Sequence, residues 1–63
     1  MEHTIDGVAY VEPAEAARRL GLSLRTLANQ RHEDRSRMRY IKLAGRVLYP
    51  VTEVERYARE LGR

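Results

Sequence analysis

The sequence predicts a small α+β domain that is mainly helical, with three short helices and one β-hairpin. Two observations predict the helices: start and stop signals bracket 13–33, and apolar residues repeat at helical spacing over 52–61. A third predicts the hairpin, because two β-prone runs over 40–49 flank a glycine-containing turn. A chain of 63 residues has room for one domain, so residues 1–63 are expected to form a single unit.

The first third of the chain predicts a short extended segment followed by a helix. Ile5–Val11 has β-branched and aromatic residues with weak alternation, which indicates a short strand or an ordered arm. Residues 1–9 are therefore expected to be a flexible arm or part of that strand. Pro13 suits the first position of a helix, and Gly21 suits the left-handed residue after its end. The first helix is predicted at Pro13–Leu20.

A second helix is predicted to follow almost at once. Ser23 is a good N-cap, and the helix should run to about Glu33. With Leu27 at the centre of its buried face, the apolar side is narrow and the polar side is wide. The face opposite Leu27 carries Arg25, Asn29 and His32.

The remaining elements are a basic loop, the hairpin and a last helix. Residues 34–39 are polar and lack periodicity, which predicts the loop. Strands at 40–43 and 46–49 surround Ala44-Gly45, and Pro50 ends the second. Thr52 as N-cap and Glu55 at N3 match a capping box, predicting a helix over Glu53–Leu61 with Gly62 as its stop. Its apolar stripe is Val54, Tyr57, Ala58 and Leu61.

Composition excludes several classes of function. The chain has no cysteine, and His3 and His32 are far apart, so we expect no metal site and no cofactor. Ser23 and His32 are the candidates for nucleophilic or acid–base chemistry, but one is a helix cap and the other a lone imidazole, so we expect no enzyme. No apolar run approaches the length of a membrane span and no signal peptide is present, which predicts a cytoplasmic protein.

Positive charge is concentrated in the middle of the chain. The net charge is +3, and eleven of the twelve basic residues are arginine. Residues 1–24 carry a net charge of −2, residues 25–46 one of +5, and residues 47–63 none. Such an asymmetry is typical of a surface that binds a polyanion, and arginine suits phosphate and guanine. A G+C-rich genome and a solvated basic loop are the alternative explanations.

Taken in order, the elements predict a winged helix-turn-helix: two short helices joined by a tight turn, a β-hairpin wing, and a closing helix. At this point the chain resembles the excisionase-type, MerR-like winged-helix domain family, over residues 10–61. The likeness departs from the family pattern at Glu12, Gln30 and Ala44. The segments that carry it are Val11–Leu27, Tyr40–Tyr49 and Thr52–Tyr57.

The resemblance implies a sequence-specific architectural protein that binds double-stranded DNA. Phage excisionases of this family bind and bend attachment-site DNA cooperatively and direct a tyrosine-type integrase to excision, in the host cytoplasm and at the nucleoid. Arg25 and Asn29 would read bases, with Ser23 and Thr26 near phosphate, and Lys42 with Arg46 would form the wing contact. The expected DNA-binding residues are Ser23, Arg25, Thr26, Asn29, His32, Arg39, Lys42 and Arg46.

Two other functions stay open. A small transcriptional regulator of a phage or mobile element would use the same domain; MerR-type regulators extend into a long dimerisation helix, whereas this chain stops at Arg63, which favours the excisionase. A protein-interaction or membrane-surface module is a third candidate, but the predicted second helix has a narrow apolar face. For assembly we expect copies placed head-to-tail on DNA, with Ile5–Val11 adding a strand to the wing of a neighbour.

Overall fold

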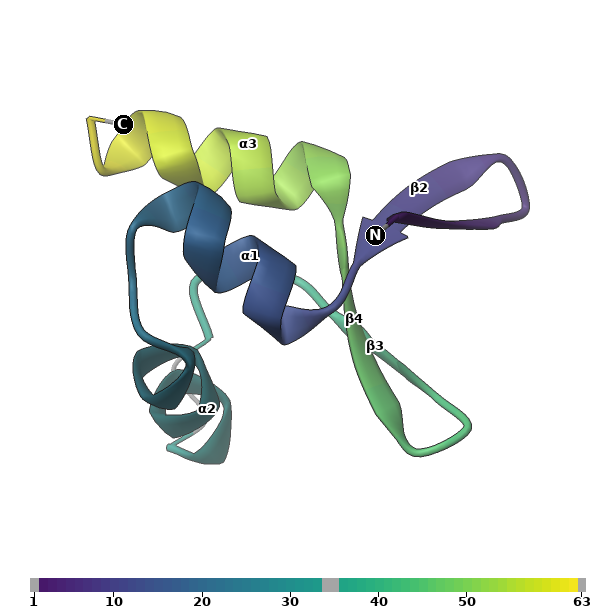
Figure 1. The fold of residues 1–63 in the computed structure, drawn as a ribbon, viewed down its shortest axis with the longest axis horizontal. Coiled ribbons are helices and arrows are strands. Elements are labelled where there is room, and N and C mark those ends of the chain that lie inside the picture. Colours follow the sequence, from purple (N-terminus) through teal and green to yellow (C-terminus); the bar gives the residue numbers. More distant parts are fainter. Residues whose placement is uncertain (1, 34–35, 63) are drawn as a thin grey trace.

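The computed structural model describes residues 2–33 and 36–62 and shows three helices and a four-stranded antiparallel sheet (Figure 1). The predicted α+β class is confirmed, with more β-structure than expected. The strands follow the order β1-β2-β4-β3. The helices are α1 (Pro13–Leu20), α2 (Leu24–His32) and α3 (Val51–Glu60), and the strands are β1 (Glu2–Ile5), β2 (Val8–Val11), β3 (Ile41–Leu43) and β4 (Arg46–Pro50).

The first two helices begin and end where their capping residues predict. α1 occupies Pro13–Leu20 as expected, and Gly21 ends it with a φ of 69°. The Ser23 side chain accepts a hydrogen bond from the Thr26 N–H at 3.0 Å and caps α2. Glu33 is the C-cap of α2, one residue beyond the helix. This pair of helices and its turn therefore follow from local signals.

The N-terminal segment is a hairpin, so the prediction of one strand or an arm over Ile5–Val11 is wrong. Asp6 and Gly7 have φ values of 51° and 78°, and they form a two-residue turn between β1 and β2. Positive φ at both central residues is the geometry of a type I′ turn, for which Asp-Gly is a favoured pair. The turn residues split the segment, and the new strand β1 starts at Glu2.

The second hairpin is present where it was predicted. Ala44 and Gly45, with φ values of 52° and 78°, form its turn in the same type I′ geometry. Its first strand starts at Ile41, one residue later than expected. β2 pairs with β4 through Val11 opposite Tyr49, and this pairing joins the two hairpins into one sheet. In Figure 1 the two hairpins diverge, one toward the upper right and one toward the lower right, and the β3–β4 turn and α2 both lie on the lower side of the view.

The capping box predicted for the last helix is wrong. α3 begins at Val51, so Thr52 lies inside the first turn, and the N-cap position belongs to Pro50, which makes no side-chain cap bond. The proline supplies a φ of −59° that leads directly from the strand into the helix, and Val51 packs against the core. The helix ends at Glu60, one residue earlier than expected, and Gly62 follows with a φ of 76°.

The core lies where α1 meets α3, α2 and β4. Its fully buried large side chains are Val11, Leu20, Leu27, Tyr49 and Val54. Met38 joins them at 3% exposure, so the predicted basic loop enters the core through its one apolar residue. Asp34 and Arg35 of that loop lie outside the described residues. Within the described part of the chain, none of the helices has the length and apolar character needed to cross a membrane.

Candidate nucleic-acid interface

The outer face of α2 places three predicted DNA-binding side chains together. Arg25, Asn29 and His32 follow one another at spacings of four and three residues, and all three are exposed. Leu27, on the opposite side of the helix, is fully buried. Within residues 2–33 and 36–62 these three side chains form no hydrogen bond or ion pair. Their donors and acceptors are therefore available to a ligand.

At the start of α2 the two predicted phosphate contacts bind each other. The Ser23 and Thr26 hydroxyl oxygens lie 2.8 Å apart, in addition to the cap bond between them. Ser23 is exposed and Thr26 is half-buried. The hydroxyls hold the first turn of the helix, and a role near phosphate stays a prediction.

Carboxylates pair with both arginines of α1 and with Arg56 of α3. On α1, hydrogen bonds from the Arg18 and Arg19 guanidinium groups lower the pKa of Glu15 to about 2. Arg19 also pairs with Glu2 of β1 at 3.0 Å. On α3, Arg56 pairs with Glu53 and Glu60 at 3.1 and 2.9 Å. Among the described residues, the exposed cations in no ion pair include Arg25 of α2, Arg37 of the loop, Lys42 of β3 and Arg59 of α3. Beside Arg56, the charge of the exposed Arg39 contributes to the lowered pKa of Glu53.

The two predicted wing residues lie on opposite faces of the β3–β4 hairpin. Lys42 pairs with Val47 and Leu43 pairs with Arg46, and adjacent cross-strand pairs point to opposite faces. Lys42 borders a hollow shared with α2. The Arg46 Nη1 atom lies 3.9 Å from Glu12 Oε1, on the side of the N-terminal hairpin. Lys42 and Arg46 therefore have different neighbours, and Arg46 has an acidic one. Their joint contact with DNA stays a prediction.

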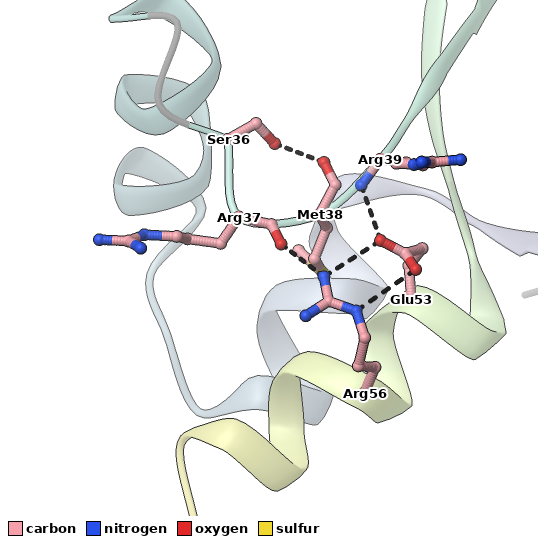
Figure 2. A pocket seen from close by; sticks show the side chains of 6 residues that line it. All are labelled: Ser36, Arg37, Met38, Arg39, Glu53 and Arg56. Atoms are coloured by element: carbon pink, nitrogen blue, oxygen red, sulfur yellow. Dashed lines mark hydrogen bonds and ion pairs between the residues drawn. The ribbon is translucent and has the colours of Figure 1, made fainter.

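The loop that carries Arg39 is fixed to α3 by its backbone. Figure 2 shows the Arg37 and Arg39 side chains pointing away from each other, while Glu53 and Arg56 hold the chain between them. Glu53 accepts a hydrogen bond from the Arg39 N–H at 3.0 Å, and Arg56 donates one to the Arg37 carbonyl at 2.6 Å. The Arg56 guanidinium, followed by the Arg39 N–H, lowers the pKa of Glu53. Ser36 donates to the Met38 carbonyl at 2.6 Å and tightens the turn.

Sequence reasoning missed Arg31 as a functional candidate. Its guanidinium carbon lies 6.0 Å from the ring centre of Tyr40 and 5.7 Å from that of Tyr49, and Nη1 donates a hydrogen bond to the Tyr49 hydroxyl. The signal available in the sequence was the position of Arg31, four residues after Leu27 and so on the buried side of α2. Glu53 and Arg56 were missed as well, although their spacing of three residues indicates a helical ion pair.

No group of three or more histidine or carboxylate side chains in the described ranges is placed to hold a metal ion. Comparison with protein-family models, with curated protein sequences and with solved structures gives no match for this chain. The proposals below therefore rest on the residues, their geometry and the resemblance in sequence pattern.

Proposed function

We propose that this chain is a sequence-specific architectural DNA-binding protein of the winged helix-turn-helix type. In this proposal α2 enters the major groove and the β3–β4 hairpin is the wing. The left-handed Gly21 and the Ser23 cap, which join α1 to α2 over a very short turn, support it. So does the position of the β3–β4 turn, which lies on the same lower side of the molecule as α2 in Figure 1.

The single observation that carries the proposal is the exposed face of α2 formed by Arg25, Asn29 and His32. An arginine can donate two hydrogen bonds to guanine and an asparagine can bind adenine in a bidentate manner. The two side chains are one helical turn apart, which places them over neighbouring base pairs. Exposed cations beside this face, such as Lys42, favour the surrounding phosphates.

Within this class we propose the role of a phage excisionase, which binds and bends attachment-site DNA and directs a tyrosine-type integrase to excision in the host cytoplasm. The resemblance of Val11–Leu27 and Tyr40–Tyr49 to the family supports this role. A small transcriptional regulator would use the same α2 surface. The arrangement of binding sites separates the two, because tandem sites favour the excisionase and a palindrome favours a dimeric regulator.

Head-to-tail assembly on DNA is supported by the strand order. The expectation that Ile5–Val11 adds the strand is wrong, because β2 within it already pairs with β1 and β4. The outer strands are β1 and β3, so β1 of one copy can pair with β3 of the next. Charge complementarity between copies contributes little. Glu2, Glu12 and Glu15 at the N-terminal end already lie in ion pairs within the same chain.

Selection from a pool of random duplexes, followed by fluorescence anisotropy in increasing salt, tests the proposal. We expect an enriched sequence and a linear fall of log K with log salt concentration, as expected when cations displace counterions from DNA. Footprints on the enriched sequence should show tandem sites. Binding that salt does not weaken, or a pool without any enriched sequence, would contradict the proposal.

A further inference from the structure

We infer that the hollow between α2 and the β3–β4 hairpin is a binding site for a single phosphate group. The hollow has a volume of about 390 Å³. Three cationic or ionisable side chains meet there from two elements, Arg31 and His32 from the last turn of α2 and Lys42 from β3. The other lining residues are Ala28, Tyr40 and Val47. Among the described residues, no carboxylate lines this hollow.

Arg31 is the anchor of the site. Its side chain is half-buried. The guanidinium packs against the rings of Tyr40 and Tyr49, which contact each other edge to face. A buried or half-buried cation is usually matched by a carboxylate, because removal from water penalises the charge. Within the described ranges Arg31 has only the Tyr49 hydroxyl as an acceptor, bound to Nη1. Its Nε and Nη2 atoms keep their donors, and a guanidinium fork fits the oxygens of a phosphate.

The position of Lys42 indicates a ligand site, because stabilisation of the α2 helix dipole would not require a cation from another element. Arg31 and His32 also lie where cations stabilise the C-terminal end of a helix dipole. Lys42 belongs to another element and faces the same hollow, because its cross-strand partner Val47 lines it too. The like charges of Arg31 and Lys42 repel each other, and an anion bound between them relieves that repulsion.

The phosphate can come from the DNA backbone or from a free phosphate ion. The DNA source rests on the proposed function, since the hollow lies between the helix and the wing that would flank one strand of the duplex. The phosphate site itself does not rest on that function. Two separate titrations therefore distinguish the sources.

The first titration adds inorganic phosphate to the isotope-labelled full chain, at constant ionic strength with chloride as the reference. We expect saturable changes in the amide chemical shifts of residues 28–32 and 40–42. The dissociation constant for phosphate should be about tenfold higher in Lys42→Gln than in the wild type. Lys42 and His32 are exposed, so Lys42→Gln and His32→Gln should leave the fold intact. Arg59→Gln, an exposed cation of α3, is the matched control and should bind phosphate like the wild type.

The second titration measures a random duplex by anisotropy with the same variants. If Lys42→Gln weakens DNA binding more than Arg59→Gln does, and if free phosphate competes with DNA, the hollow binds a phosphate of the DNA backbone. Phosphate binding at the hollow together with equal DNA affinity of both variants supports the site and assigns it to free phosphate. DNA binding without saturable phosphate shifts in this region would overturn the inference and leave the proposed function standing. Absence of both would overturn both.

Discussion

The carboxylate of Glu53 in α3 accepts a hydrogen bond from the backbone N–H of Arg39, at 3.0 Å from Oε1. The same carboxylate binds Arg56, which in turn donates to the Arg37 carbonyl. Two side chains of α3 thus fix the loop that leads from α2 to the hairpin (Figure 2). The relative placement of α2 and the β3–β4 hairpin depends on this loop, because it joins them.

Replacing Glu53 should therefore loosen the loop. We expect Glu53→Ala to lower the free energy of unfolding by about 1 kcal/mol, because it removes a charge-assisted hydrogen bond and leaves the Arg39 N–H without it. Urea denaturation measures this change. The matched variant is Glu55→Ala, an exposed glutamate of the same helix, which should unfold like the wild type. Equal stability of the two variants would contradict a role for Glu53 in holding the loop.

Arg25 is predicted to read a base. Arg25→Ala should cost about 1–3 kcal/mol of binding free energy on the selected sequence and much less on a random duplex, because a lost base contact affects only the correct sequence. Anisotropy on both duplexes measures the difference. Arg59→Ala on α3 serves as the control. Equal losses on the two duplexes would make Arg25 a backbone contact.

The wing residues can be separated because they lie on opposite faces of the hairpin. We expect Arg46→Ala to weaken binding to every sequence and to reduce the salt slope by about one unit, as the loss of one phosphate contact does. Lys42→Ala is the matched variant on the other face. A wild-type slope in both variants would show that neither face of the hairpin touches DNA.

Ala44 has a positive φ of 52° in a turn that favours asparagine or glycine. An alanine in this region is strained by about 1–2 kcal/mol. Ala44→Asn should therefore raise the free energy of unfolding by about 1 kcal/mol, measured in urea. The corresponding turn residue of the first hairpin, Asp6, is already favourable, so Asp6→Asn should change little. A less stable Ala44→Asn variant would contradict the turn geometry.

Stability should depend on acid pH through Glu15. Its pKa lies at about 2 in the folded chain and near the ordinary value of 4.5 once unfolded. Because the pKa is lowered by folding, the Glu15 carboxylate stabilises the fold at pH values above its pKa in the unfolded chain. This stabilisation is lost as the pH falls toward its pKa in the folded chain. The melting temperature of the wild type should exceed that of Glu15→Gln at neutral pH, and the gap should close between about pH 4.5 and 2. A gap that stays constant over this range would contradict the effect of Arg18 and Arg19.

Local signals predicted the parts of the fold that depend on a few adjacent residues. Gly21 and Ser23 define the turn between α1 and α2, and Gly45 defines the second hairpin. The same chemistry was present in Asp6-Gly7, but the weak alternation of the flanking residues hid the first hairpin. For α3 the capping box predicted a start after Thr52, but the helix begins at Val51, directly after Pro50 at the end of the strand. Val51 packs against the core, and this tertiary contact favours the earlier start.

The candidate site divides in the same way. Helical periodicity alone places Arg25, Asn29 and His32 on one face of α2, because that face depends only on spacing. The stack of Arg31 on Tyr49 and the bond from Arg39 to Glu53 join residues 18 and 14 positions apart. Such contacts depend on how β4 and α3 pack, and no local pattern in the sequence contains that information.

Amide shift mapping with a DNA duplex tests the central claim most directly. The isotope-labelled chain would be titrated with the selected duplex at low salt and again at high salt. The account predicts the largest shifts at Arg25, Asn29 and His32 and around the Ala44-Gly45 turn, with small shifts on the ion-paired faces of α1 and α3, and a loss of all shifts in high salt. Absence of binding at low salt, or shifts concentrated on the outer face of α3, would contradict it.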